Sequence, residues 1–167
     1  MKLPIQTNDL ENKVIVITGA GGVLCSLMAK GLAQAGAKIA LLDRSDSAEA
    51  VAAEIVAAGG TAKAYLADVL QKDSLAKCHA AVLQDLGKCD ILVNGAGGNN
   101  PAATTDKEYY EAGVPDAGTK TFFDLSQEGV SATFALNFLG TLLPTQEFAK
   151  DMVGRKGCSV LNISSMN

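Results

Sequence analysis

The sequence predicts an α/β protein in which helices cover both faces of a parallel β-sheet, forming three layers. Short, continuous apolar runs alternate with Ala-rich segments of helical length. Continuous apolar runs are typical of strands that are buried on both faces of a parallel sheet. Aromatic residues make up only 5% of the 167 residues, while Ala and Gly are plentiful, so helices can pack closely on such a sheet.

The elements follow one another in a regular order that implies right-handed crossovers and a doubly wound sheet. We expect strands at Val14–Ile17, Ile39–Leu42, Ala62–Leu66, Ile91–Val93 and Val160–Ile163. We expect helices at Leu24–Ala35, Ser47–Ala58, Ser74–Leu86 and, as one long helix, Ser126–Val153. Gly36 fits a helix C-cap, and Asp46 and Asp73 fit N-caps. Pro144 is expected to kink the long helix.

Composition excludes several classes of protein. The net charge of −4 and the lack of a basic cluster argue against a nucleic-acid partner. No apolar stretch of 18 residues or signal-type segment is present, so we expect a cytoplasmic protein without a membrane span. The spacing of the cysteines fits no metal or redox motif, so we expect reduced, mostly buried thiols at Cys25, Cys78, Cys89 and Cys158. For His79, the only histidine, a structural role is favoured over a catalytic one.

A glycine-rich turn follows the first predicted strand and opens the first predicted helix. It reads Thr-Gly-Ala-Gly-Gly-Val-Leu-Cys over residues 18–25. A helix N-terminus attracts a pyrophosphate, and glycines let the backbone approach it closely. This context predicts a Rossmann-type dinucleotide site, although an ordinary tight turn is the alternative. The candidate binding residues in the turn are Gly19, Gly21, Gly22, Val23 and Leu24.

Further candidates stand at the ends of the next strands. Asp43 lies 24 residues after Gly19, the spacing of an acid that binds the ribose hydroxyls of NAD and repels the 2′-phosphate of NADP. Arg44 could offset part of that repulsion, and Asp43 could instead be a turn residue. We therefore expect NAD(H), with NADP(H) as the less favoured cofactor. Candidates near the adenine and the nicotinamide ribose are Asp68, Val69, Asn94, Ala96 and Gly97.

These motifs, with Asn137 in Asn-Phe-Leu-Gly and the final Asn-Ile-Ser-Ser, resemble the short-chain dehydrogenase/reductase family across nearly the whole chain. Four short segments resemble the branch of D-mannonate oxidoreductases, or fructuronate reductases, within this family. They are residues 21–24, 94–101, 121–125 and 162–167. The resemblance implies an NAD(H)-dependent oxidoreductase that interconverts the alcohol and ketone of a sugar acid. It also implies a homodimer or homotetramer, with the long helix at an interface.

The resemblance assigns catalytic roles residue by residue. Ser165 would bind the substrate oxygen, and Asn137 would support a proton-relay water. The family's general acid/base is a tyrosine with a lysine four residues later, and none of Tyr65, Tyr109 and Tyr110 fits that pattern. The chain ends two residues after Ser165, so we expect an incomplete fold that is inactive by itself. The alternative is a dinucleotide-binding module without catalysis.

Two other features depart from common members of the family. Val23 and Cys25 stand where glycines are usual, and we expect Cys25 to push its helix outward or to weaken phosphate binding. The loop 97–125 is long and holds Pro101, Pro115 and four glycines. We interpret residues 1–167 as one domain with this loop as a substrate-side lid, in which Lys107 or Lys120 attracts an acid. A surface insertion that packs on a neighbouring subunit is the alternative.

Overall fold

A five-stranded parallel sheet forms the centre of the molecule, with strand order β3-β2-β1-β4-β5. The structure is a computed structural model that describes residues 10–109 and 118–164. The winding reverses between β1 and β4, as in a Rossmann-type doubly wound sheet. The strands are β1 (Val14–Thr18), β2 (Lys38–Asp43), β3 (Thr61–Leu66), β4 (Ile91–Asn94) and β5 (Ser159–Asn162).

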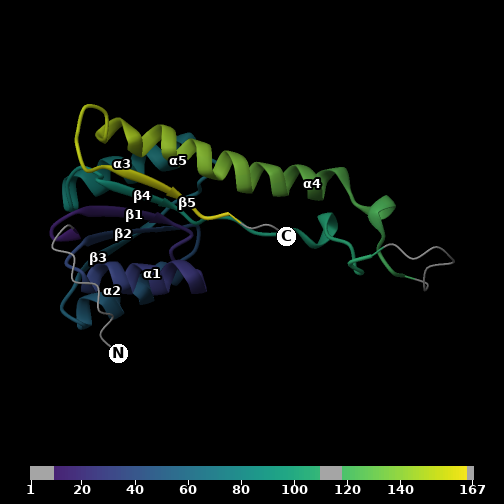
Figure 1. Cartoon of the computed structure of the whole chain (residues 1–167), viewed down its shortest axis with the longest axis horizontal. Helices are drawn as coiled ribbons and strands as arrows, with labels where there is room; N and C mark the ends of the chain where they lie inside the picture. Colours follow the sequence, from purple (N-terminus) through teal and green to yellow (C-terminus); the bar gives the residue numbers. More distant parts are fainter. Residues whose placement is uncertain (1–9, 110–117, 165–167) are drawn as a thin grey trace.

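Helices cover both faces of the sheet and complete three layers (Figure 1). One face carries α1 (Val23–Gln34) and α2 (Ser47–Ala57), whose Ala33, Val51 and Ile55 join the same core as β1 and β2. The other carries α3 (Lys72–Asp85) and α5 (Gly140–Phe148), which bury Val82 and Phe148. The predicted three-layer α/β fold is confirmed.

The strand predictions are correct to within one residue at each end. The expected burial on both faces holds for β1, β2 and β4 but not for the outer strands β3 and β5. All five residues of β1 are buried, as expected for a central strand. The outer strand β3 alternates between exposed and less exposed side chains, which explains its weaker apolar run. All four residues of β5 are exposed, since this strand pairs only with β4 in the described part of the chain.

Helix ends were harder to predict than strands. Gly36 follows α1 with a φ of +90°, which suits a residue just beyond a helix end. Asp46 stands at the N-cap of α2, although its side chain makes no capping hydrogen bond. The predicted N-cap at Asp73 is wrong, because Gln71 is the N-cap and Asp73 lies inside the first turn of α3. There its carboxylate suits the positive end of the helix dipole.

The predicted long helix consists of several segments of different geometry. It runs through α4 (Gln127–Phe134), a π-helical turn (Ala135–Leu139), α5 and a 3₁₀ turn (Ala149–Asp151). Pro144 lies within α5, and the kink expected at this residue remains a prediction. The π-helical turn, which the sequence analysis did not predict, holds Asn137, and single π turns often occur at functional sites.

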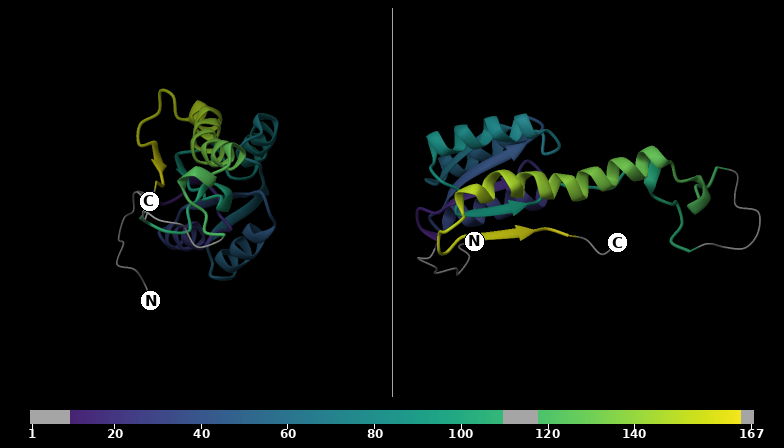
Figure 2. Two further views of the ribbon diagram at one scale, coloured as in Figure 1. Left: turned by 90° about the vertical axis from the view of Figure 1, so that its right-hand side faces the viewer. Right: turned by 90° about the horizontal axis from the view of Figure 1, so that it is seen from above.

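The described parts of the loop 97–125 form an arm that extends from the sheet together with α4 (Figure 2). Its described part contains two short 3₁₀ helices, Pro101–Ala103 and Phe122–Asp124. The two sides of the arm are joined at Ser126, whose N–H donates to Ala102, and at Asp106, whose N–H donates to Lys120. Residues 110–117 lie outside the described residues, so the lid remains a prediction.

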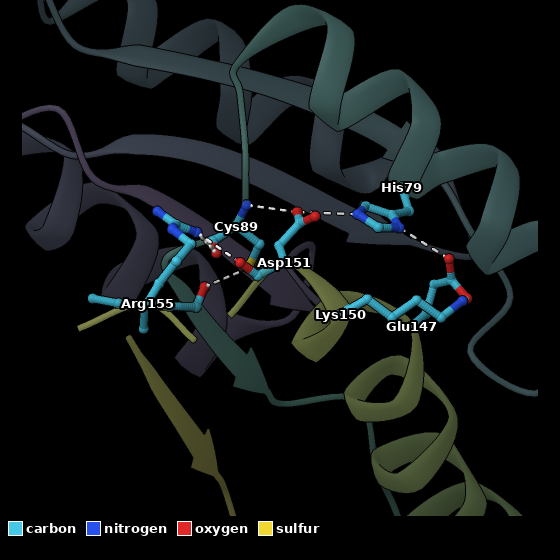
Figure 3. A network of polar contacts seen from close by, with 7 residues as sticks. His79, Cys89, Glu147, Lys150, Asp151 and Arg155 are labelled. Carbon is cyan, nitrogen blue, oxygen red and sulfur yellow. Dashed lines mark hydrogen bonds and ion pairs between the residues drawn. The ribbon is translucent and has the colours of Figure 1, made fainter. Parts of the chain in front are cut away.

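A polar network joins α3, the end of the α5 region and the start of β4 (Figure 3). His79 lies 2.9 Å from Glu147 Oε1 and 3.0 Å from Asp151 Oδ2, one carboxylate at each ring nitrogen. Asp151 also accepts from the Cys89 N–H at 2.9 Å. Arg155 donates to the carbonyl oxygen of Cys89 and pairs with Asp90. These contacts confirm the structural role that was expected of His79.

The remaining sequence expectations concern thiols and membranes. Cys25, Cys78 and Cys89 are buried and unpaired, and Cys158 is partly exposed. Burial, followed by the charge of Asp151, raises the pKa of Cys89 to about 12, as expected for an unreactive buried thiol. Within residues 10–109 and 118–164, no helix has the length and apolar content needed to cross a membrane.

Candidate functional site

A cleft of about 440 Å³ opens at the carboxyl edge of the sheet, beside the point between β1 and β4 where the winding reverses. Ligands of doubly wound sheets bind at this point. The described residues that line the cleft come from the glycine turn, the start of α1, the end of β2, the segments that follow β2, β3, β4 and β5, and the π-helical turn. They are Gly19, Gly22, Val23, Leu24, Cys25, Leu42, Asp43, Arg44, Ala67, Asp68, Val69, Leu70, Gly95, Ala96, Gly97, Leu136 and Ile163.

The glycine turn brings the backbone of β1 against that of the loop after β4. Gly19 has a φ of +65°, and a Cβ there would lie 2.9 Å from the Ala96 Cα, so only glycine fits. Gly22 is the N-cap of α1 and donates its N–H to the Gly19 oxygen. Val23 and Leu24, which follow, are exposed on the cleft. The N-terminus of a 12-residue helix therefore faces the cleft and could hold a phosphate.

Cys25 is accommodated by a glycine 70 positions away in the sequence. A Cβ at Gly95 would lie only 2.2 Å from the Cys25 sulfur, so the thiol occupies the space that a side chain at position 95 would need. Burial, followed by the nearby Asp43 carboxylate, raises the pKa of the thiol. This glycine makes room for the thiol, which the local motif did not reveal, and the expected outward push of α1 or weaker phosphate binding stays a prediction.

Asp43 stands at the end of β2 and contacts the glycine turn directly. Its Oδ2 accepts from the Gly21 N–H at 2.9 Å, and its Oδ1 accepts from the Ser45 N–H at 3.1 Å and the Ser45 hydroxyl at 3.0 Å. A carboxylate at this place can accept hydrogen bonds from ribose hydroxyls and repels an additional phosphate. The exposed side chain of Arg44 lies beside it on the same cleft.

The loop after β3 supplies a second carboxylate to the cleft. Asp68 is exposed, and its Oδ1 accepts from the Leu70 N–H at 2.9 Å. Its backbone N–H donates to the Ser74 hydroxyl at 3.0 Å, which anchors the loop to α3. Val69 is buried beneath it and packs near Gly140 of α5. Asp68 therefore presents a carboxylate that could accept from an adenine amino group.

Two polar side chains hold the floor of the cleft together. The Thr18 hydroxyl, at the end of β1, accepts from the N–H groups of Gly95 and Ala96, both at 3.1 Å. The Asn94 amide donates to Thr145 and to Asn162, both at 2.9 Å. Asn94 thus supports the floor from below, because its side chain is buried and bridges β4, β5 and α5.

Asn137 binds the loop after β4 through its side chain. Its Oδ1 accepts from the Gly98 N–H at 2.9 Å, and its Nδ2 donates to the Gly98 oxygen at 3.0 Å. A Cβ at Gly97 would lie 2.9 Å from the same Oδ1. The side-chain amide is therefore committed to the loop. The role of Asn137 in a proton relay remains a prediction.

Two further candidates from the sequence are Ser165 and Lys120. Ser165 lies outside the described residues, while its exposed neighbour Ser164 follows β5 at the cleft edge of the sheet. The Lys120 ammonium donates to the Pro101 oxygen at 2.5 Å, so it is engaged inside the arm. Sequence reasoning missed Ser45 and Ser47, although two serines just after a strand-end acid are a readable signal. In the described part of the chain, no three His, Cys, Asp or Glu side chains form a group that could hold a metal.

The geometry can now be compared with known proteins. The sequence model of the short chain dehydrogenases matches residues 13–167. The chain belongs to this family. The matched residues include the glycine turn, Asp43 and residues 95–97, which meet at the cleft.

Several relatives are similar over almost the whole chain. A Haemophilus influenzae crystal structure, provisionally described as a D-mannonate oxidoreductase with bound NAD, has 54% sequence identity and a TM-score of 0.90. The match covers 94% of this chain and 56% of that one. An uncharacterised oxidoreductase of the same species is 54% identical, covering 96% of this chain and 56% of the relative. The uncharacterised oxidoreductase UxuB of Bacillus subtilis is 44% identical, covering 99% and 58%. The chain thus spans a little over half the length of these relatives.

Proposed function

We propose that this chain binds NAD(H) as part of an oxidoreductase that interconverts the alcohol and the ketone of a sugar acid, of the D-mannonate/D-fructuronate type. The observation that carries the proposal is the position of Asp43, which lines the cleft and accepts from the Gly21 N–H. That carboxylate suits the ribose of NAD, and the glycine turn with the start of α1 suits its pyrophosphate. The NAD bound to the Haemophilus protein supports the same cofactor.

Different residues along the cleft are suited to different parts of the cofactor and the substrate. The Asp68 carboxylate is suited to the adenine amino group, and Ala96 and Gly97 to the nicotinamide ribose. A bound nicotinamide would supply hydride chemistry, and the residues of the cleft would orient it. Ser165 would hold the substrate oxygen, and Asn137, through the turn that holds it, would support proton transfer. The whole protein would act as a cytoplasmic homodimer or homotetramer.

Cofactor choice is the direct test. We expect the chain to bind NAD more tightly than NADP, and Asp43→Ala to weaken NAD binding by about tenfold or more, the loss of a charged hydrogen-bond partner. The same change should tighten NADP binding, because Arg44 remains beside the cleft. Titration of both cofactors by calorimetry measures the ratio, with Asp73→Ala, an exposed acid outside the cleft, as the control. A ratio that does not move with Asp43→Ala overturns the assignment.

Substrate choice needs the full-length oxidoreductase. We expect D-mannonate to reduce NAD there, and Ser165→Ala to lower kcat by about 10²-fold or more, since the substrate oxygen loses its hydrogen-bond partner. Formation of NADH is followed by absorbance, with D-gluconate as a comparison substrate. Tight NAD binding without turnover of any sugar acid would instead support a dinucleotide-binding module without catalysis.

A further inference from the structure

Four residues form a closed ring beside the cleft. The Gly21 N–H donates to Asp43 Oδ2, and Asp43 Oδ1 accepts from the Ser45 hydroxyl at 3.0 Å. The Ser45 and Ser47 hydroxyls are 2.8 Å apart. The fourth side of the ring is a close contact rather than a hydrogen bond, because the Ser47 hydroxyl oxygen lies 1.8 Å from where a Cβ at Gly21 would be. The glycine turn, the acid and the first residue of α2 are therefore joined in one unit.

The ring determines which part of the carboxylate can meet a ligand. An ionised carboxylate offers about four lone-pair sites, two on each oxygen. Both sites on Asp43 Oδ1 are occupied, by the Ser45 N–H and the Ser45 hydroxyl. One site on Oδ2 is used by Gly21, which leaves the other for a donor in the cleft. Asp43 lines the cleft whereas Ser45 does not, so the serine holds the carboxylate from outside.

We infer that Ser45 and Ser47 are positioning residues that fix the Asp43 carboxylate for the 2′-hydroxyl of the adenosine ribose. A lone aspartate on an exposed loop would sample several rotamers, and restricting them before binding reduces the entropy lost on binding. The hydroxyl of Ser47 orients that of Ser45, which in turn holds Oδ1. Because Gly21 belongs to the same ring, the acid and the phosphate-binding turn are held in one fixed arrangement.

The inference rests on the proposed binding of NAD and deepens it. We expect Ser45→Ala to weaken NAD binding by about 3- to 10-fold, the usual effect of removing one hydrogen bond. Ser45→Thr, which keeps the hydroxyl, should retain most of the affinity. Ser47→Ala should weaken binding by about 2-fold, since it acts only through Ser45. Ser131→Ala, at an exposed serine of α4, is the matched control.

A purely structural role of the serines is distinguished by a second ligand. An NAD analogue without the 2′-hydroxyl on its adenosine ribose cannot use the positioned carboxylate. We expect Ser45→Ala to bind this analogue as well as the unchanged chain does, while its loss persists for NAD. Calorimetry with both ligands and a thermal unfolding curve of each variant provide the comparison. Ser47→Ala leaves the bond between Asp43 and Ser45 in place, so it tests the same idea if Ser45→Ala does not fold.

The outcomes separate the two proposals. If the unchanged chain does not bind NAD, the proposed function fails and the inference fails with it. If it binds NAD but Ser45→Ala and Ser47→Ala bind equally well, only the role of the serines is overturned. An equal loss for NAD and for the analogue also overturns that role, because the serines would then only hold the loop between β2 and α2.

Discussion

The two edges of the sheet treat carboxylates differently. At the amino edge, Asp90 uses both carboxylate oxygens: Oδ2 accepts from the Val14 N–H at 2.9 Å, and Oδ1 pairs with Lys13 and Arg155. At the carboxyl edge, the carboxylates of Asp43 and Asp68 line an open cleft, and each keeps only part of its hydrogen-bonding capacity for the protein. Polar satisfaction stabilises a fold, whereas an open cleft with accessible carboxylates is suited to a ligand. Stability and binding are thus assigned to opposite ends of the same strands.

The largest loss of stability is expected from a change at Asp90, and it tests whether the two edges act separately. Asp90→Ala removes the acceptor of a buried backbone N–H and the partner of two cations, and should lower the free energy of unfolding by about 2–3 kcal/mol. Chemical denaturation measures this loss, with Asp73→Ala as the exposed control. The NAD affinity of the folded variant should stay unchanged. A parallel fall in affinity and stability would show that the two edges are not separate.

A smaller effect is expected where the sheet meets the cleft. Gly95→Ala places a Cβ against the Cys25 sulfur and should cost about 1–2 kcal/mol of stability and weaken NAD binding. Adding Cys25→Ala should restore part of both losses. The restoration is partial because the Thr18 oxygen also lies 3.0 Å from the new Cβ. Denaturation and NAD titration of the two single variants and the double variant form a complete cycle. Strictly additive losses would mean that the two residues do not share this space.

The smallest effect is a pH dependence at the amino edge. Burial alone would raise the pKa of Glu147, but hydrogen bonds from Lys150 and His79 outweigh it and hold the pKa below its ordinary value. The folded chain therefore favours the charged carboxylate. Its stabilisation is complete above the ordinary pKa of glutamate and is lost as the pH falls through the lower, folded pKa.

Melting temperatures of the unchanged chain and of Glu147→Gln test this dependence between pH 7 and pH 3. We expect the free energies of unfolding of the two proteins to differ by less than about 1 kcal/mol at pH 7, because Lys150 is largely exposed and its ion pair with Glu147 is screened by solvent. The difference should shrink as the pH falls. A gap that widens toward acid would mean that Glu147 is favoured in its neutral form.

Much of the fold and part of the site could be predicted, because those features leave local signals. Buried strands are continuous apolar runs, and Asp43 stands at a fixed distance after Gly19. What could not be predicted depends on contacts between distant positions. The space that Gly95 leaves for Cys25 is invisible in the glycine motif alone.

Helix geometry shows the same limit. The π-helical turn at Ala135–Leu139 carries no strong breaker, and Pro144, the obvious breaker, lies beyond it within α5. Local helix propensity identifies Pro144 as a residue that fits a helix poorly. It does not predict the wider π-helical turn Ala135–Leu139, in which Asn137 contacts the loop after β4.

The pair of hydrogen bonds between Asn137 and Gly98 restricts which residue types can stand at position 137. The side-chain amide imitates a peptide group and meets both the N–H and the oxygen of Gly98. Aspartate lacks the donor, and glutamine is one methylene too long to keep the same spacing. Selection for a well-shaped loop would therefore preserve asparagine at this position even without turnover. The presence of Asn137 alone therefore does not distinguish a working enzyme from a binding protein.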